Sequence, residues 1–66
     1  MKITLNGQPK QLHTTASLKT VIEQFCKDTH HVIAEVNGDI IKRPSWEQKT
    51  LADGDTIELV NFVGGG

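Results

Sequence analysis

Four parts of this chain have a residue type or a position that could support chemistry, and they are Gly64-Gly65-Gly66, Cys26, His30-His31 and Asp53-Gly54-Asp55. The glycine run ends the sequence at a carboxylate, which is ionised at neutral pH and is a poor electrophile until it is activated. Glycine has no Cβ, so such a tail can pass through a narrow channel and leaves both faces of the acyl carbon open. The carboxyl group of Gly66 is therefore the strongest chemical candidate, although terminal glycines alone are also typical of frayed chain ends.

The other three groups fit structural roles better. Neighbouring histidines on a strand point to opposite faces, and no second ligand pair accompanies His30 and His31, so we expect exposed loop histidines and no metal site. Cys26 falls on the apolar stripe of a predicted helix, which favours a buried and unreactive thiol. Asp53-Gly54-Asp55 lacks the ligand series of a calcium loop and predicts a turn. We expect no cofactor.

Length and composition narrow the class of protein. A chain of 66 residues makes a single domain with a small core and little room for an enclosed ligand cavity, which favours a carrier or binding role over an enzyme. The net charge of −1 and the absence of a basic run argue against nucleic-acid binding. The longest apolar run is Val32-Ile33-Ala34, far too short for a membrane span. A single cysteine fits a reducing cytoplasm.

The N-terminal residues predict a β-hairpin. Ile3 and Leu5 alternate with polar residues, as in a half-buried strand, and Asn6-Gly7 is a strong signal for a tight turn. A second strand is expected over residues 10–13, with Leu12 pointing inward. Since proline has no amide hydrogen, Pro9 predicts that this strand lies at a sheet edge.

One helix is expected in the middle of the chain. Its apolar stripe has the spacing i, i+3, i+4, i+7 and i+8, and the residues are Leu18, Val21, Ile22, Phe25 and Cys26. Ser17 suits the N-cap position. Lys27 is expected in the last turn, where a positive charge complements the helix dipole.

The second half of the chain predicts strands and turns. A β-branched strand is expected over residues 32–36, followed by a turn at Asn37-Gly38 and a short apolar pair, Ile40-Ile41. Residues 42–48 should be irregular or a short helical turn, with Trp46 over one end of the core and Lys42 and Arg43 in solvent. The longest strand is expected over residues 56–63.

This order of elements predicts an α+β protein with the β-grasp (ubiquitin-like) fold, in which one helix packs across a mixed sheet of four to five strands. The last strand should enter the sheet centre beside the first, with the right-handed crossover that such connections favour. Residues 1–63 would form the domain, and residues 64–66 a flexible glycine tail.

The last strand also predicts a docking surface. Ile57 and Leu59 should face the helix, and strict alternation then places Val60 and Phe62 on the opposite face. Large apolar residues on an exposed face just before the tail favour a partner-binding role for Val60, Phe62 and Val63. The alternative is a bulge that turns Phe62 into the core.

Several motifs occur together at this chain length, and they are the short hairpin, Asn37-Gly38, Arg43-Pro44-Ser45-Trp46, Asp53-Gly54-Asp55-Thr56-Ile57 and the terminal glycines. In this order, and over the whole chain, they resemble the ThiS family, the sulfur carriers of thiazole formation in thiamine biosynthesis. A sister family, the small subunit of molybdopterin synthase, shares the fold and the terminal diglycine. Its members tend to be longer and to carry a proline pair where this chain has Asn61-Phe62-Val63. The thiamine branch is preferred, and the molybdopterin branch is the alternative.

The resemblance implies a function for the tail. A ubiquitin-activating-like adenylating enzyme of the ThiF type would convert Gly66 to an acyl-adenylate, and sulfur transfer would then give a thiocarboxylate. Gly64 and Gly65 would carry this group into the partner's active site, and a thiazole synthase of the ThiG type would receive the sulfur. The chain would be a protein cosubstrate and not an enzyme. A ubiquitin-like interaction module whose tail is never activated is the alternative from another class.

Overall fold

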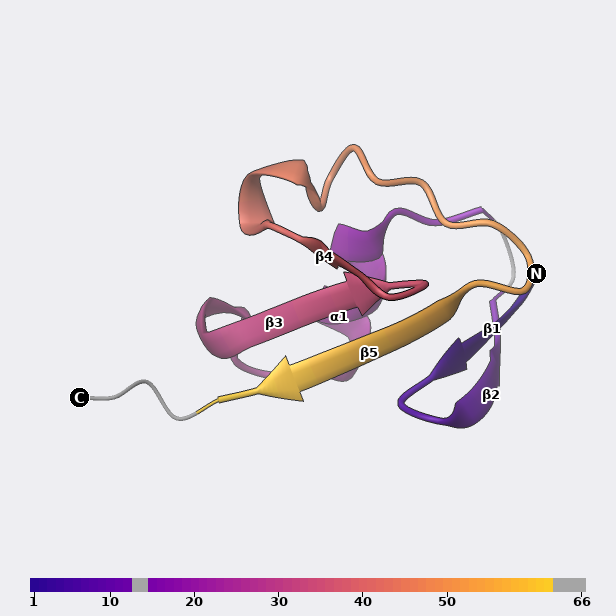
Figure 1. The fold of residues 1–66 in the computed structure, drawn as a ribbon, viewed down its shortest axis with the longest axis horizontal. Helices are drawn as coiled ribbons and strands as arrows, with labels where there is room; N and C mark the ends of the chain where they lie inside the picture. The colour runs from indigo at the N-terminus through magenta and orange to yellow at the C-terminus, as the bar shows by residue number, and fades with distance from the viewer. Residues whose placement is uncertain (13–14, 63–66) are drawn as a thin grey trace.

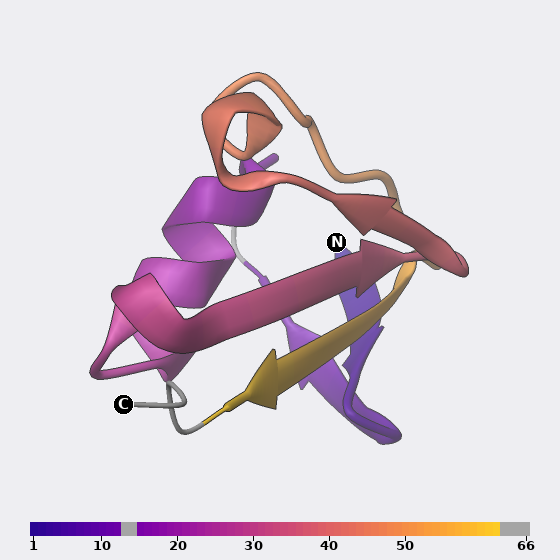
Figure 2. The same cartoon turned by 60° about the vertical axis from the view of Figure 1, so that its left-hand side comes forward.

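A five-stranded mixed sheet with one helix packed on one face forms the computed structural model, which describes residues 1–12 and 15–62 (Figure 1). The strands are β1 (Lys2–Leu5), β2 (Gln8–Gln11), β3 (Val32–Val36), β4 (Asp39–Ile41) and β5 (Thr56–Asn61). The helices are α1 (Leu18–Phe25) and two 3₁₀ turns, η1 (Thr29–His31) and η2 (Arg43–Ser45). In Figure 2 the helix is seen on one side of the sheet, while the other face of β3 and β5 has no covering layer within the described residues.

The sheet order is β2-β1-β5-β3-β4, so the last strand lies at the centre. β5 pairs in parallel with β1, where Leu5 is opposite Ile57, and antiparallel with β3. The predicted α+β arrangement, with the final strand beside the first, is confirmed. β5 therefore leads from the middle of the sheet directly towards the C-terminus.

The N-terminal hairpin forms around Asn6 and Gly7, whose φ angles of 49° and 81° lie in the left-handed region that such a turn requires. β2 begins at Gln8 and ends at Gln11, whereas the sequence predicted residues 10–13. The earlier start follows from the tight turn, which places Gln8 directly opposite Leu5. Pro9 lies in the edge strand, as predicted. Leu12 is buried just beyond it.

Helix α1 begins as predicted but is shorter than its apolar stripe. The Ser17 side chain accepts a hydrogen bond from the amide of Thr20 at 3.2 Å and caps the helix. The helix ends at Phe25, and Cys26 has extended backbone angles, so Lys27 lies outside the last turn. The expected position of Lys27 was therefore wrong.

The two residues at the end of the stripe are not fully buried. Phe25 is exposed, with the Lys10 ammonium 5.6 Å from its ring centroid, and Cys26 is half-buried. The sequence predicted both inside the core. Here the chain leaves the helix to start η1, where the Asp28 side chain accepts from the amide of His30 and favours a new turn over further helix.

The core lies between α1 and the inner face of the sheet. Its buried members come from every layer, and they are Ile3, Leu5, Leu12, Leu18, Val21, Ile22, Val32, Ala34, Val36, Trp46, Leu51 and Ile57. Trp46 closes one end of it, as predicted, and its indole Nε1 donates to the carbonyl of Ile41 at 2.8 Å. This hydrogen bond satisfies the polar edge of a buried ring.

The turn before β5 is held by side-chain hydrogen bonds. Gly54 has a φ of 88°, and the Asp55 carboxylate accepts from the Ala52 amide at 2.7 Å and from Asn37 Nδ2 at 3.0 Å. Asn37 also accepts from the amide of Thr56 at 2.9 Å. The predicted turn is confirmed, and it fixes the residue at which β5 begins.

Candidate functional site

The residues predicted to carry chemistry, Gly64, Gly65 and Gly66, lie outside the described residues, and so does Val63. The predicted boundary between the domain and the tail falls in the same segment. β5 ends at Asn61, whereas the sequence predicted a strand through Val63. Phe62 is therefore the last described residue before the tail.

Strand β5 presents apolar residues on both faces of the sheet. Ile57 is buried and Leu59 is half-buried on the helix side, as alternation predicted. On the other face, Val60 is 52% exposed and Phe62 is 42% exposed. Phe62 does not turn into the core, so the bulge alternative is wrong.

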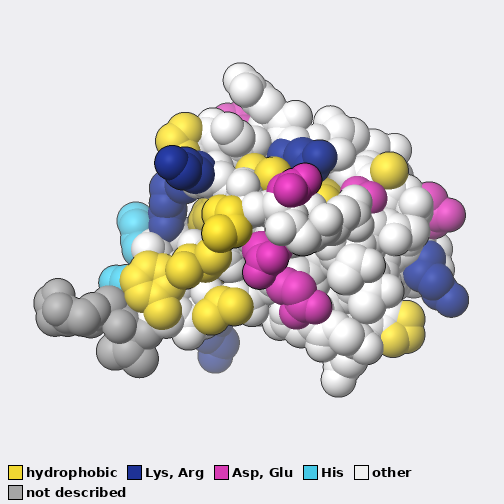
Figure 3. Space-filling view, in the orientation of Figure 1, with side chains coloured by type: hydrophobic (Ala, Val, Ile, Leu, Met, Phe, Trp, Pro, Cys, Tyr) yellow, Lys and Arg dark blue, Asp and Glu magenta, His cyan; other side chains and the backbone are white. Residues whose placement is uncertain are grey.

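Two further apolar residues extend this exposed surface. Ile33 of β3 lies directly opposite Val60 and is 44% exposed, and Ile40 of β4 is 65% exposed. Together the four residues Ile33, Ile40, Val60 and Phe62 form what we call the outer patch. Figure 3 shows hydrophobic side chains gathered on this face, towards the end of the sheet where β5 ends.

The sequence analysis missed Ile33 and Ile40, although a signal was available for Ile33. Val32, Ala34 and Val36 are buried, so alternation along β3 places Ile33 on the other face. Ile40 could not be placed without knowing the register of the short strand β4, which sets it opposite Glu35. Pairing of separate strands is needed to assemble the outer patch.

Phe62 is fixed by two contacts to His31. Its amide donates to the His31 carbonyl at 2.8 Å, and its ring meets the imidazole edge-on, with centroids 5.6 Å apart. The imidazole is oriented in turn by Asp28, whose carboxylate lies 2.7 Å from Nδ1. The hydrogen bond to His31, followed by that from the His30 amide, holds the pKa of Asp28 below its usual value. The backbone just before the tail therefore has a defined position.

The histidines, the acidic residues and Cys26 were the other candidates for chemistry, and the structure does not place them in a reactive site within the described residues. Within residues 1–12 and 15–62, no group of three or more His, Cys, Asp or Glu side chains could hold a metal ion. Burial raises the pKa of the Cys26 thiol, which disfavours the reactive thiolate. In the part of the chain that the structure describes, no helix is long and apolar enough to cross a membrane.

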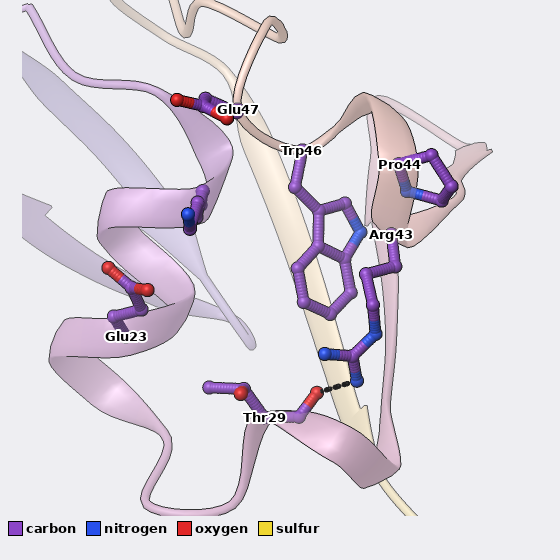
Figure 4. Close-up of a pocket in the computed structure, with 7 residues that line it drawn as sticks. Glu23, Thr29, Arg43, Pro44, Trp46 and Glu47 are labelled. Atoms are coloured by element: carbon purple, nitrogen blue, oxygen red, sulfur yellow. Dashed lines mark hydrogen bonds between the residues drawn. The ribbon is translucent and has the colours of Figure 1, made fainter.

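A groove of about 320 Å³ lies between α1 and the segment around η2 (Figure 4). The Arg43 guanidinium stacks over the Trp46 ring at 4.9 Å and donates to the carbonyl of Thr29. Arg43 is exposed, as expected, and its hydrogen bond also connects η2 to η1. The groove carries both signs of charge, since Lys19 and Glu23 line it.

Comparison with known proteins identifies the family. A model of the ThiS family matches residues 3–66, and the match thus includes the terminal glycines. The chain belongs to the ThiS family. This ThiS chain is 34% identical over 65 residues to the sulfur carrier protein ThiS of Bacillus subtilis, covering 97% of this chain and 98% of the relative. It is 29% identical to the sulfur carrier protein ThiS of Escherichia coli, covering both chains completely.

Another relative is much longer. A thiazole synthase of Paramagnetospirillum magneticum is 30% identical over 66 residues. The alignment covers the whole of the given chain but only 20% of the length of that protein. Among solved structures, the crystal structure of the thiamine biosynthesis protein ThiS from Geobacter metallireducens matches with a TM-score of 0.86 and 28% identity, covering both chains completely. The β-grasp prediction is thereby confirmed. The carrier prediction agrees with the names of the relatives of similar length.

Proposed function

We propose that this chain carries sulfur for thiazole formation in thiamine biosynthesis as a thiocarboxylate on Gly66. The observation that supports this most directly is the family match through residue 66, because it includes the terminal glycines. Coverage of nearly the whole Bacillus subtilis carrier supports the same role for the full chain. The names of the relatives favour the thiamine branch over the molybdopterin alternative.

The proposed chemistry has two steps. A carboxylate oxygen of Gly66 attacks the α-phosphorus of ATP on a ThiF-type adenylating enzyme, and pyrophosphate leaves. Hydrosulfide then attacks the acyl carbon, the bond to AMP breaks, and a thiocarboxylate forms with loss of one proton. A persulfide can supply the same sulfur if a second thiol afterwards reduces the sulfur–sulfur bond. The carrier provides the acyl group, and the partner provides the catalysis.

The outer patch is the proposed docking surface for this partner. Val60 and Phe62 immediately precede the tail, so a protein that covers them also lies over the point where the tail leaves the domain. The four residues beyond Phe62 can span at most about 14 Å, at 3.3–3.6 Å per residue. Because ordering a glycine segment on binding costs entropy, the folded domain is expected to supply much of the affinity. An apolar surface beside the tail is suited to that task.

A thiazole synthase of the ThiG type is the proposed recipient of the sulfur. Support comes from two thiazole synthases, of Paramagnetospirillum magneticum and Magnetococcus marinus, in each of which about a fifth of the length matches this chain. Carrier-like and synthase sequences joined in one protein are expected when the two act on the same sulfur atom. The single cysteine fits action in a reducing cytoplasm.

Intact-mass spectrometry tests the proposal. The chain is incubated with a ThiF-type adenylating enzyme, MgATP and sulfide, and the enzyme is first shown to be active on another carrier. We expect a mass increase equal to the exchange of one oxygen for one sulfur atom. A variant that lacks Gly66 should show no increase. If the full chain forms neither the adenylate nor the thiocarboxylate, the interaction-module alternative is favoured.

A further inference from the structure

Two glutamates lie beside the outer patch on the same face of the sheet. Glu58 of β5 is directly opposite Glu35 of β3, one outward position along from the pair Val60 and Ile33. Glu35 is also opposite Ile40 of β4. The acidic pair therefore adjoins Ile40 of the neighbouring strand β4, as well as Ile33 and Val60 further along its own two strands. Figure 3 shows acidic side chains next to the hydrophobic group. We call Glu35 and Glu58 the acidic pair.

The acidic pair has no cationic partner within the described part of the domain. Among residues 1–12 and 15–62, the only ion pair within 4.0 Å is that of His31 with Asp28. Directly opposed side chains on adjacent strands have Cβ atoms only about 5 Å apart, and like charges at this separation oppose folding. The exposed Glu58 and the half-buried Glu35 therefore lie opposite each other on the outer face with no cation of the described chain beside them.

We propose that the partner that covers the outer patch brings an arginine or lysine against the acidic pair. This inference rests on the proposed function, because it specifies the chemistry of the adenylating partner's surface. A cation placed between the two carboxylates would relieve their mutual repulsion and form charge-assisted hydrogen bonds, while apolar side chains of the same partner cover the outer patch. Charge complementarity of this kind raises the association rate and fixes the register of the interface.

The same charges disfavour a second copy of this chain as the occupant. Two domains joined face to face through the outer patch would cover both acidic pairs without supplying a cation to either. Burying carboxylates that have no cationic partner costs free energy and disfavours that pairing. The isolated protein is therefore expected to sediment as a monomer, and a stable dimer formed through this face would overturn the proposal.

The proposal predicts that stability and binding change in opposite directions. Glu58→Gln removes the repulsion and should raise the melting temperature of the free domain, and Glu58→Lys should raise it further by forming a cross-strand pair with Glu35. Both substitutions should weaken binding to the partner. The loss should be larger for Glu58→Lys, because the introduced ammonium group would face the partner's cation. A substitution that damaged the fold would lower both quantities together.

The test is the KM of this chain for a ThiF-type adenylating enzyme, measured by pyrophosphate release at several salt concentrations. With Glu35→Gln and Glu58→Gln combined, KM should rise about three- to tenfold at low salt, and its dependence on salt should weaken. Glu47→Gln changes the net charge by one unit on the groove side and serves as the control, with KM close to that of the wild type. If the enzyme acts on the wild type and the variant with both substitutions has the same KM, the inference is wrong and the carrier function stands. If the enzyme does not act on the wild type, the carrier function falls, and this inference falls with it.

Discussion

The two faces of β5 carry similar side chains in opposite surroundings. Ile57 is completely buried under α1, whereas Val60, three residues further on, is half-exposed on a face that no layer of the described chain covers. A sheet covered on one side usually has polar residues on the other, because apolar groups there gain nothing from folding. The difference indicates that the inner face serves the stability of the domain. It also supports the proposal that the outer patch is a docking surface.

The largest expected effect is a difference in unfolding free energy between substitutions on the inner and the outer face of β5. Ile57→Ala should cost about 2–5 kcal/mol, since it leaves a cavity in a small core, and Val60→Ala should cost less than about 0.5 kcal/mol. Urea unfolding of both variants measures the contrast. Ile57→Val should lose about 0.5–1.5 kcal/mol and keeps a folded baseline if the alanine variant does not fold. Equal losses at Ile57 and Val60 would remove the distinction between the faces.

Phe62→Ala tests the outer patch by function. The substitution removes exposed apolar surface beside the tail and an edge contact with His31. We expect adenylation efficiency to fall about tenfold, as for a moderately important interface residue, while the unfolding free energy falls by about 1 kcal/mol or less. Adenylation kinetics and thermal unfolding are measured on the same preparation. A collapsed melting temperature with unchanged kinetics would show that Phe62 acts in folding alone.

Acid unfolding tests the turn at Asp53-Gly54-Asp55, which determines where β5 begins. Hydrogen bonds from the Ala52 amide, and then from Asn37, lower the pKa of Asp55. The pKa of Asp55 is therefore lower in the folded domain than in the unfolded chain, so the ionised carboxylate stabilises the folded state. This stabilisation is fully present above the ordinary aspartate pKa of about 3.9. It is lost as the pH falls through the pKa of the folded state. Asp55→Asn should cost about 1 kcal/mol at neutral pH and reduce the loss of stability below about pH 4. An unchanged acid limb in the variant would show that another carboxylate controls it.

The smallest expected effect concerns Cys26, which borders the core at the end of α1. Burial raises the pKa of its thiol, so iodoacetamide should label the native protein more slowly than the urea-unfolded protein at neutral pH. Mass spectrometry over time follows the reaction. Equal rates would mean that the end of α1 does not shield the thiol, and that the inner layer is less closed there than its burial indicates.

Much of the fold could be predicted because local patterns agreed with the final structure. Asn6-Gly7 and Asn37-Gly38 specified turns through positive φ angles, and Ser17 specified the helix start. The helix end was predicted less well, because periodicity shows which residues share a face but not where a competing turn begins. Asp28 starts that turn, and Phe25 consequently lies at the rim instead of in the core.

By itself, the sequence determined which residues alternate along β5 and that three glycines follow this strand, because both are properties of neighbouring residues in the chain. The assembly of the outer patch was decided by the tertiary structure. Ile33 meets Val60, and Glu35 meets Glu58, only through the antiparallel pairing of β3 with β5. These partners are far apart in the chain, and a register shift of one residue would turn each strand's other face outward. Strand pairing, set by the buried face, therefore decides the composition of the exposed one.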